Sequence, residues 1–337
     1  MLTHDEEHNV TPPMIDGYGR AIDYVRIALT EACNLRCTYC LREEGAGHAP
    51  DRLMLDTTEI GRLMGVLGKM GIRKIRFTGG EPLLRRDLPE LVSIAKTTAG
   101  IRSVKLTTNG LLLEQRIQEL MAAGLDGINL SLDTLDAARF RLITRRDEFS
   151  KVRRALDLLL GMPEIRFKVN VLMLRGVNQD EIPAFVELTR DFGVTVRFME
   201  LQPFDDRQIW RTGKYMGAEM IREHLQRSFP DIESAAGNDT EHYSFRVPGY
   251  RGTVAIIPAY SRNFCSRCSR LRITSDGRIV SCLYRDESLD LLPLLRRDAT
   301  EESELRHAIA EAVRMKPQDG LKSRDGNAVR SMSQIGG

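Results

Sequence analysis

The stretch "YVRIALTEACNLRCTYC", residues 24–40, decides the fold prediction because a strand-like run leads directly into three cysteines. Residues 24–29 form a short, apolar run with β-branched members, which favours a strand. Cys33, Cys37 and Cys40 follow with the spacing C-x3-C-x2-C. In barrels built from βα units, functional groups lie at the carboxyl ends of the strands. The stretch therefore predicts the first strand of an α/β fold with a thiol site at its end.

A regular alternation of strands and helices continues from this stretch. Further strand-like runs lie at 74–78, 103–108, 127–132, 166–173 and 195–201. Helical patterns lie between them at 57–71, 87–100, 112–124, 149–162 and 180–193. Such alternation predicts parallel βαβ units. No G-x-G-x-x-G follows the first strand, so we predict an incomplete TIM-like (β/α)6 barrel, with an open doubly wound sheet as the alternative.

The alternation stops near residue 204, and Gly- and Pro-punctuated short strands take over. The sequence "TSDGRI", residues 274–279, predicts a tight hairpin, and a helix is expected near 302–315. We therefore predict three parts. They are a flexible N-terminal arm at 1–16, the barrel at 17–235, and a smaller C-terminal domain at 236–337.

The composition of the 337 residues is that of an ordinary globular chain, with a formal net charge of +2. So small a charge provides no broad field for nucleic acid or an anionic membrane. The sequence lacks a transmembrane run, and its acidic N-terminus does not resemble a signal peptide. We expect a cytoplasmic protein, in which disulfides are disfavoured.

A second cysteine triplet, Cys265, Cys268 and Cys282, lies far along the chain from the first. Structural zinc takes four ligands, and neither triplet has a fourth cysteine nearby; His48 is the closest candidate for the first. Three thiolates can hold a 4Fe–4S cluster that keeps one iron open to a small molecule. We favour such a cluster at each triplet, while a structural zinc site and an inert second cluster stay open.

Cations gather near the second triplet and within the predicted strands. They are Arg262, Arg267, Arg270 and Arg272 near the cysteines, and Arg26, Arg76, Lys168 and Arg197 in the strands. Unpaired buried charge is costly, so inward-facing arginines predict a bound anion, and several together suit a polyphosphate. The alternative is pairing with Glu81, Asp133 and Glu200. No P-loop occurs, so phosphates would be held by these side chains.

The first triplet, with Tyr39 before its last cysteine, resembles the signature of the radical S-adenosylmethionine (SAM) superfamily. The segments "FTGGEP" at 77–82, "TTNG" at 107–110 and "SLD" from Ser131 also resemble that superfamily. The resemblance implies SAM bound at the open iron, and one electron that cleaves it to a 5′-deoxyadenosyl radical. It implies SAM contacts from Tyr39, Gly80 and Ser131. Gln202 stands where a methionine is common near the adenine of SAM, and we include it.

Together with the second triplet, the strand arginines and the ending "MSQIGG", the chain resembles the superfamily branch that cyclises GTP in molybdenum cofactor biosynthesis. This resemblance spans residue 24 to the end. It implies two 4Fe–4S clusters, on Cys33, Cys37 and Cys40 and on Cys265, Cys268 and Cys282. It implies GTP contacts from Arg26, Arg76, Thr107, Lys168, Arg197, Arg270, Leu271 and Arg272. Arg270 and Arg272 are the expected catalytic residues, and Gly336 and Gly337 are expected to enter the site.

The implied reaction removes a hydrogen atom from ribose C3′ of GTP, after which C3′ attacks guanine C8. An electron donor, a downstream cyclic pyranopterin monophosphate synthase and a homodimer are further expectations. Two other hypotheses remain open at this point. One is a radical SAM maturase that modifies peptides and carries an auxiliary cluster; the other is a non-catalytic zinc or iron–sulfur scaffold.

Overall fold

The structure is a computed structural model, and it describes residues 11–40, 54–202, 213–236, 243–261, 265–285, 287–297, 302–320 and 322–323. Residues 1–10 of the predicted arm, His48, Arg262, Gly336 and Gly337 lie outside the described residues. Within the predicted arm, Met14–Ile15 forms β1, which pairs with β2 at Ala21–Ile22.

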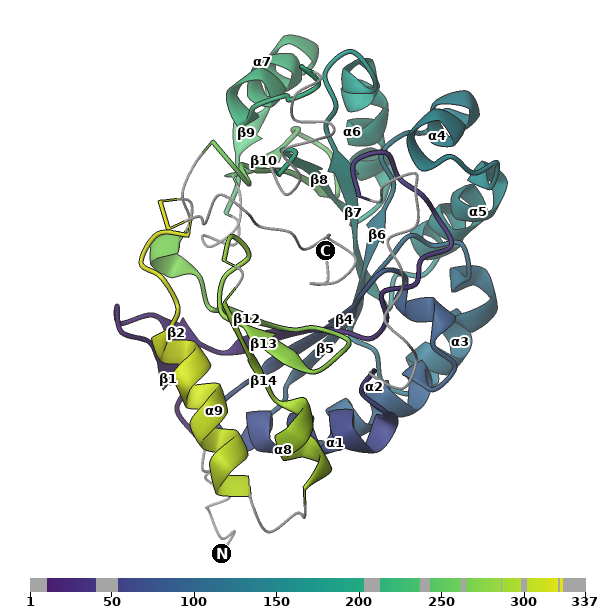
Figure 1. The fold of residues 1–337 in the computed structure, drawn as a ribbon. Helices are drawn as coiled ribbons and strands as arrows, with labels where there is room; N and C mark the ends of the chain where they lie inside the picture. Colours follow the sequence, from purple (N-terminus) through teal and green to yellow (C-terminus); the bar gives the residue numbers. More distant parts are fainter. Residues whose placement is uncertain are drawn as a thin grey trace, which may run out of the picture.

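The predicted incomplete barrel is confirmed, because the described residues contain six neighbouring parallel strands in chain order (Figure 1). They are β3 (Tyr24–Ala28), β4 (Lys74–Thr78), β5 (Ser103–Thr108), β6 (Gly127–Ser131), β7 (Arg166–Leu172) and β8 (Thr195–Met199). Helices lie on the outer side of this sheet (Figure 1). They are α1 (Thr57–Lys69), α2 (Leu88–Thr97), α3 (Leu113–Ala122), α4 (Ala137–Thr144), α5 (Phe149–Leu160) and α6 (Ile182–Asp191).

The alternation of side chains along each strand separates an apolar outer face from a polar inner face. On β3, Val25 and Ile27 are fully buried in the main hydrophobic core, whereas Arg26 lies between them on the opposite face. On β5, Val104 and Leu106 are likewise fully buried in that core. The helices therefore cover the apolar face, and the inner face is left to charged and polar groups.

The C-terminal strands extend the same sheet at both of its edges. At one edge β12 (Arg270–Ile273) pairs in parallel with β3 and continues into β13 (Arg278–Val280) and β14 (Ser288–Asp290). At the other edge β11 (Thr253–Ile257) pairs in parallel with β8 and continues into β10 (Tyr243–Arg246) and β9 (Glu233–Ser234). The residues after 236 are thus continuous with the barrel sheet, and the domain boundary at 235 stays a prediction.

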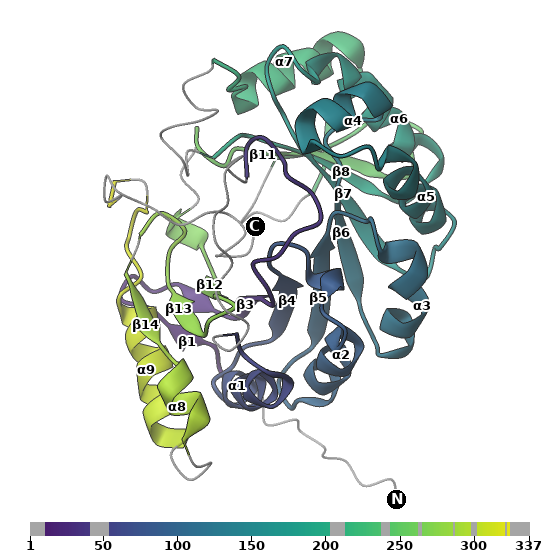
Figure 2. The ribbon, with the colours of Figure 1, turned by 45° about the vertical axis from the view of Figure 1, so that its right-hand side comes forward.

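The remaining helices are α7 (Ala218–Ser228), α8 (Leu292–Arg296) and α9 (Glu302–Arg314), and short 3-10 turns lie at Pro82–Leu84, Gln179–Glu181 and Cys265–Arg267. Helix α9 packs against β1, β13 and β14 (Figure 2). The predicted hairpin joins β12 to β13, and its Gly277 has φ +85°, a backbone conformation that favours glycine. No helix among the described residues is long and apolar enough to cross a membrane.

The sequence patterns placed the ends of several helices too late and missed one helix. Helices α1, α2 and α3 stop before Gly71, Gly100 and Gly124, which all have positive φ and begin the turn to the next strand. Helix α4 was not predicted because it is short and buries few apolar side chains.

Glu200 ties three parts of the chain together just after β8. Its side chain is buried, and its Oε1 accepts a hydrogen bond from the Ala218 N–H at 2.6 Å, at the start of α7. Its Oε2 accepts from the N–H groups of Tyr260 and Ser261, both at 2.7 Å. These two residues precede Cys265 by a few positions, so the carboxylate fixes the chain that leads into the second triplet.

We predict that Glu200→Gln lowers the free energy of unfolding by about 2–3 kcal/mol, because an amide nitrogen would face backbone N–H donors that lose their acceptor. Urea unfolding measures the change. The matched control is Glu219→Gln on α7, where an exposed ion pair with Arg222 is expected to contribute less than about 1 kcal/mol. Equal losses in the two variants would contradict the role given to Glu200.

Candidate active site

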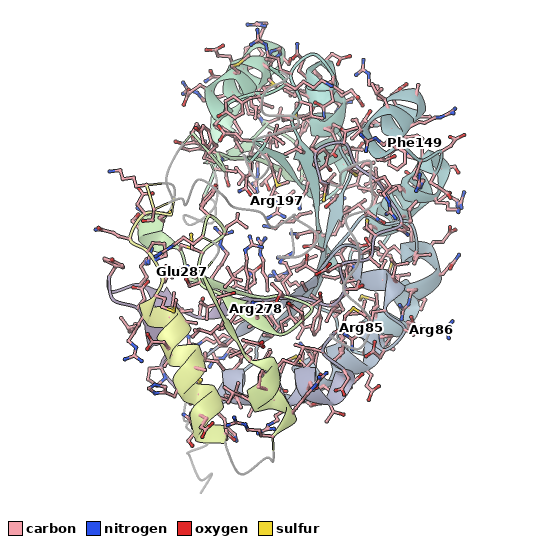
Figure 3. All side chains as sticks on the ribbon, viewed as in Figure 1. Arg85, Arg86, Phe149, Arg197, Arg278 and Glu287 are labelled. Atoms are coloured by element: carbon pink, nitrogen blue, oxygen red, sulfur yellow. The ribbon has the colours of Figure 1, made fainter. Side chains whose placement is uncertain are left out.

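Both cysteine triplets open onto one cavity of about 360 Å³ inside the barrel. The sulfurs come from the loop after β3 and from the chain around β12 and β13. Most of the other site residues predicted from the sequence line the same cavity. They are Arg26, Tyr39, Gly80, Thr107, Ser131, Arg197, Gln202, Arg270 and Arg272. Figure 3 shows Arg197 on the inner side of the barrel.

The loop of the first triplet is held in place by its backbone. The N–H groups of Arg36 and Thr38 donate to the carbonyl oxygens of Thr144 and Ile143, at 3.0 and 2.9 Å, at the end of α4. Around the first sulfur, the Leu35 N–H lies 3.4 Å from Cys33 Sγ. The helix that the sequence analysis missed is therefore a support of the thiol loop.

Two glycines after β4 allow the chain to pass close to this loop. A Cβ on Gly79, which has φ +141°, would lie 2.5 Å from the Thr30 carbonyl oxygen. A Cβ on Gly80 would lie 2.3 Å from the Ala32 carbonyl oxygen. The Gly80 N–H donates to the Thr30 oxygen at 2.7 Å. The Gly-Gly pair is therefore required by backbone contact with the thiol loop, and it also lines the cavity.

Tyr39 is anchored by a buried carboxyl group. Its hydroxyl donates to Asp133 Oδ2 at 2.6 Å, and Asp133 Oδ1 accepts from the Leu172 N–H at 2.8 Å. Burial raises the pKa of Asp133 to about 6, although these hydrogen bonds oppose the shift. The contact fixes the residue before Cys40 to the end of β6.

Arg20 and Lys316 brace the second triplet. Arg20 forms a buried ion pair with Asp16 at 2.5 Å, and its guanidinium donates to the carbonyl oxygens of Cys265 at 2.5 Å and Pro317 at 2.8 Å. Lys316 Nζ donates to the carbonyl oxygens of Arg270 and Ser281, both at 2.8 Å. The two cations thereby join the cysteine loop, β12 and the segment after α9.

The sulfurs of the second triplet have the surroundings of metal ligands. The Gly320 N–H donates to Cys265 Sγ at 3.2 Å, and a Cβ on Gly320 would lie 2.5 Å from Cys282 Sγ. Burial opposes ionisation of Cys268, but the charges of Lys316 and Arg270 outweigh it and lower the pKa of this thiol to about 6. A thiolate is the form that binds metal, so the donor set fits an iron–sulfur cluster. No three His, Cys, Asp or Glu side chains in the described part of the chain are arranged to hold a single metal ion.

Several cations of the cavity wall lie close to one another. Burial, then the charges of Arg26 and Arg270, lower the pKa of Arg272 to about 9. Arg197 is buried, and its guanidinium donates to Asn170 Oδ1 at 2.8 Å. A wall of neighbouring cations favours an anion in the cavity, because bound negative charge relieves their mutual repulsion.

Three residues predicted to contact the substrate do not line this cavity. Arg76 is buried and donates to the Tyr24 hydroxyl at 2.6 Å and to Thr107 Oγ1 at 3.2 Å. Lys168 is half-buried on β7. Leu271 is fully buried in the main core, because it lies on the opposite face of β12 from its neighbours.

Comparisons with known proteins assign the chain to a family. The model described as Radical SAM superfamily matches residues 27–189, and the one described as Molybdenum Cofactor Synthesis C matches residues 194–321. A Chlorobaculum tepidum protein named GTP 3′,8-cyclase is 60% identical over 96% of this chain and 97% of its own length. The chain belongs to the GTP 3′,8-cyclase family. As a member of the radical SAM superfamily, it uses a 4Fe–4S cluster and SAM.

Other relatives share the family name over nearly the same length. One from Desulforamulus reducens is 39% identical over 96% of this chain and 100% of its own length. A solved structure of Streptococcus suis SuiB has a TM-score of 0.59 at 14% identity, covering 86% of this chain and 68% of SuiB. At such low identity the likeness extends to the fold alone, and the family assignment rests on the sequence relatives.

Sequence reasoning missed two classes of residue in this GTP 3′,8-cyclase family member. Arg20 and Lys316 belong to no motif. Their roles depend on hydrogen bonds to backbone carbonyl groups far away in the sequence, and no sequence pattern indicates these contacts. Asn129 and Asn170 line the cavity from within strands, where a polar residue at an inward position was the available signal. The sequence analysis offered Glu81, Asp133 and Glu200 as alternative partners for the arginines. In the structure these carboxylates accept hydrogen bonds from backbone N–H groups and hydroxyl groups; the Thr108 hydroxyl, for example, donates to Glu81 at 2.7 Å.

We predict that Arg20→Met lowers the free energy of unfolding by about 3–5 kcal/mol, because it leaves the Asp16 carboxylate buried without its cation. Denaturant unfolding of the full chain measures this loss. The control is Arg278→Met, which removes a more exposed ion pair with Asp290 at 3.8 Å and is expected to cost less than about 1 kcal/mol. A loss at Arg20 no larger than at Arg278 would contradict the bracing role.

Proposed function

We propose that the chain catalyses the SAM-dependent conversion of GTP to (8S)-3′,8-cyclo-7,8-dihydroguanosine 5′-triphosphate, the first step of molybdenum cofactor biosynthesis. One observation carries the proposal: two cysteine triplets share one cavity with a group of arginines. Such a cavity can hold both ends of one nucleotide, its base near thiol-bound metal and its phosphates on guanidinium groups. The family membership supports the same reaction.

Cys33, Cys37 and Cys40 are the proposed ligands of the first 4Fe–4S cluster. When bound, this cluster and SAM supply a 5′-deoxyadenosyl radical that takes a hydrogen atom from the substrate. Four cavity-lining residues are proposed to hold SAM: Tyr39, Gly80, Ser131 and Gln202. Without a side chain, Gly80 lets a ligand approach its backbone, and the buried contact with Asp133 keeps the Tyr39 ring in position.

Cys265, Cys268 and Cys282 are the proposed ligands of a second 4Fe–4S cluster, whose open iron takes the guanine base. Lys316 and Arg270 favour the thiolate form of Cys268, which assists ligation. Arg20 and Lys316 hold the backbone on both sides of the triplet. The base-binding end of the site is therefore attached to a rigid part of the sheet.

The phosphate end of GTP is assigned to the cations and polar groups of the inner face. The proposed contacts are Arg26, Arg76, Thr107, Lys168, Arg197, Arg270, Leu271 and Arg272. Arg270 and Arg272 are the proposed catalytic residues because they lie beside the second triplet and face the cavity. Leu271 contributes through its backbone, since its side chain is in the core. Holding both ends of GTP fixes ribose C3′ relative to the radical source and lowers the entropic part of the barrier.

The proposal includes partners beyond GTP and SAM. A one-electron donor must reduce the first cluster, and a cyclic pyranopterin monophosphate synthase is proposed to take the product onward. A homodimer and insertion of Gly336 and Gly337 into the cavity also belong to the proposal. A peptide-modifying maturase is less favoured, because the C-terminal part has three cysteines where such enzymes commonly carry longer arrays.

We predict that the anaerobically reconstituted full chain forms 5′-deoxyadenosine and a cyclised nucleotide from GTP and SAM. About four irons per triplet are expected, because each is proposed to hold one 4Fe–4S cluster. Mass spectrometry and metal analysis measure both quantities. Two zinc ions per chain with no 5′-deoxyadenosine would overturn the proposal in favour of a scaffold.

We predict that Arg270→Ala and Arg272→Ala each weaken GTP binding by about tenfold or more, because each removes a charge-assisted phosphate contact. Iron content should stay at the wild-type level in both variants, because Lys316, whose charge lowers the pKa of Cys268 more than that of Arg270 does, is retained. Equilibrium dialysis with labelled GTP measures the affinity, and Arg278→Ala on the neighbouring strand serves as the matched control. Wild-type affinity in both variants would remove the phosphate role from β12.

A further inference from the structure

A row of cations crosses the barrel sheet at one register level. Reading from β12 to β7, the laterally paired residues are Arg272, Arg26, Arg76, Lys105, Gly127 and Arg166. Neighbouring strands lie about 4.8 Å apart, and like charges directly opposite each other are destabilising. The row therefore places like charges side by side, and a bound anion would offset their mutual repulsion.

The side chains of the row belong to the inner face of the sheet, and Arg166, at the first position of β7, is exposed at its end. Lys105 alternates with Val104 and Leu106, which are fully buried in the core, and shares its face with Thr107 of the cavity wall. Arg166 shares its face with Asn170, which also lines the cavity. Lys105 and Arg166 thus extend the surface on which the arginines of the candidate site lie.

The row continues beyond the cavity. Arg26 and Arg272 line it, whereas Arg76 lies next along the row, with its guanidinium between the Tyr24 hydroxyl and Thr107 Oγ1. Lys105 follows on the next strand. Gly127 contributes no side chain between Lys105 and Arg166, and a Cβ there would lie 2.7 Å from the Arg166 carbonyl oxygen, so the two strands approach closely at this position.

The charged groups near Lys105 are mostly cations. The side chain is half-buried, and burial, then the charges of Lys74 and Arg76, lower its pKa, while Tyr24 alone opposes them. Lys74 Nζ lies 4.4 Å from the centre of the Tyr24 ring, on the same side of the sheet. Among the described residues, Lys105 and Arg166 have no carboxylate in an ion pair. Such a group of cations favours an oxyanion.

We propose that Lys105 and Arg166 bind the terminal phosphate of the nucleoside triphosphate substrate, an inference that rests on the proposed function. The continuity of the row favours the substrate over a free oxyanion, because a triphosphate is itself a row of anionic groups. Its inner phosphates lie on Arg26 and Arg272, and the outermost one reaches past Arg76. Arg166 offers paired N–H donors for phosphate oxygens, and Lys105 acts as a point charge.

This arrangement makes the number of phosphates a determinant of affinity. GDP and GMP lack the group that Lys105 and Arg166 contact, so removing these cations should affect GTP alone. A site that binds a terminal phosphate disfavours ligands that lack this phosphate, because the cations of the site are then left without a counter-charge.

The test measures binding of GTP, GDP and GMP to the anaerobically reconstituted full chain by equilibrium dialysis. Lys105→Met and Arg166→Gln each remove one charge and keep much of the side chain. The matched control is Arg102→Gln, an exposed cation just before β5. We expect about tenfold weaker GTP binding in both variants, GDP and GMP affinities within about twofold of wild type, and little change in the control.

Three outcomes would overturn the inference. They are unchanged GTP affinity in both variants, an equal loss for all three nucleotides, and pyrophosphate binding to wild-type protein already saturated with GTP. An equal loss for all three nucleotides would indicate that the two cations contribute only to the overall electrostatic potential of the site. Pyrophosphate binding to GTP-saturated protein would indicate a separate oxyanion site. The proposed function fails by a different result, namely wild-type protein that forms no cyclised nucleotide. Equal iron content and equal denaturation midpoints in all variants show that the comparison concerns folded protein.

Discussion

Parallel pairing of β12 with β3 is the constraint on which the site depends. It sets Arg272 beside Arg26 and brings the strand that follows Cys268 against the strand that precedes Cys33. The first triplet follows the carboxyl end of β3, whereas Cys268 precedes β12 and Cys282 follows the antiparallel β13. The two triplets therefore lie toward opposite ends of the paired strands, and both open onto the cavity. Extending the sheet in parallel thus joins a thiol site at the start of the chain to another near its end.

The same pairing concentrates positive charge on the inner face. Burial, then the nearby charges of Arg26 and Arg270, lower the pKa of Arg272 to about 9. Such repulsion costs stability in the folded chain, and a bound polyphosphate offsets it. The fold therefore supplies the electrostatic field for substrate binding, whereas Glu200, Arg20 and Lys316 supply rigidity through buried hydrogen bonds to the backbone.

The barrel, both cysteine triplets and several cations of the cavity wall could be predicted from sequence, because strand alternation and the cysteine spacings are local patterns. The joining of β12 to β3 could not, since pairing between strands so far apart in the chain depends on the three-dimensional packing of the whole sheet. For the same reason Arg20 and Lys316 escaped notice: their hydrogen bonds reach carbonyl groups distant in sequence. Leu271 was predicted to contact GTP because the family resemblance covers residues 270–272. Its side chain instead lies in the core, because side chains alternate between the two faces of β12.

The claim that most needs testing is that the open position of the second triplet faces the substrate base. Replacing Cys33, Cys37 and Cys40 together with alanine leaves Cys265, Cys268 and Cys282 as the remaining thiol set. Electron paramagnetic resonance of the reduced variant, with GTP labelled with nitrogen-15 in its guanine, then reports on that cluster alone. We predict a GTP-dependent change in the spectrum with hyperfine coupling to the labelled nitrogen. An iron–sulfur signal that is identical with and without GTP would contradict the account.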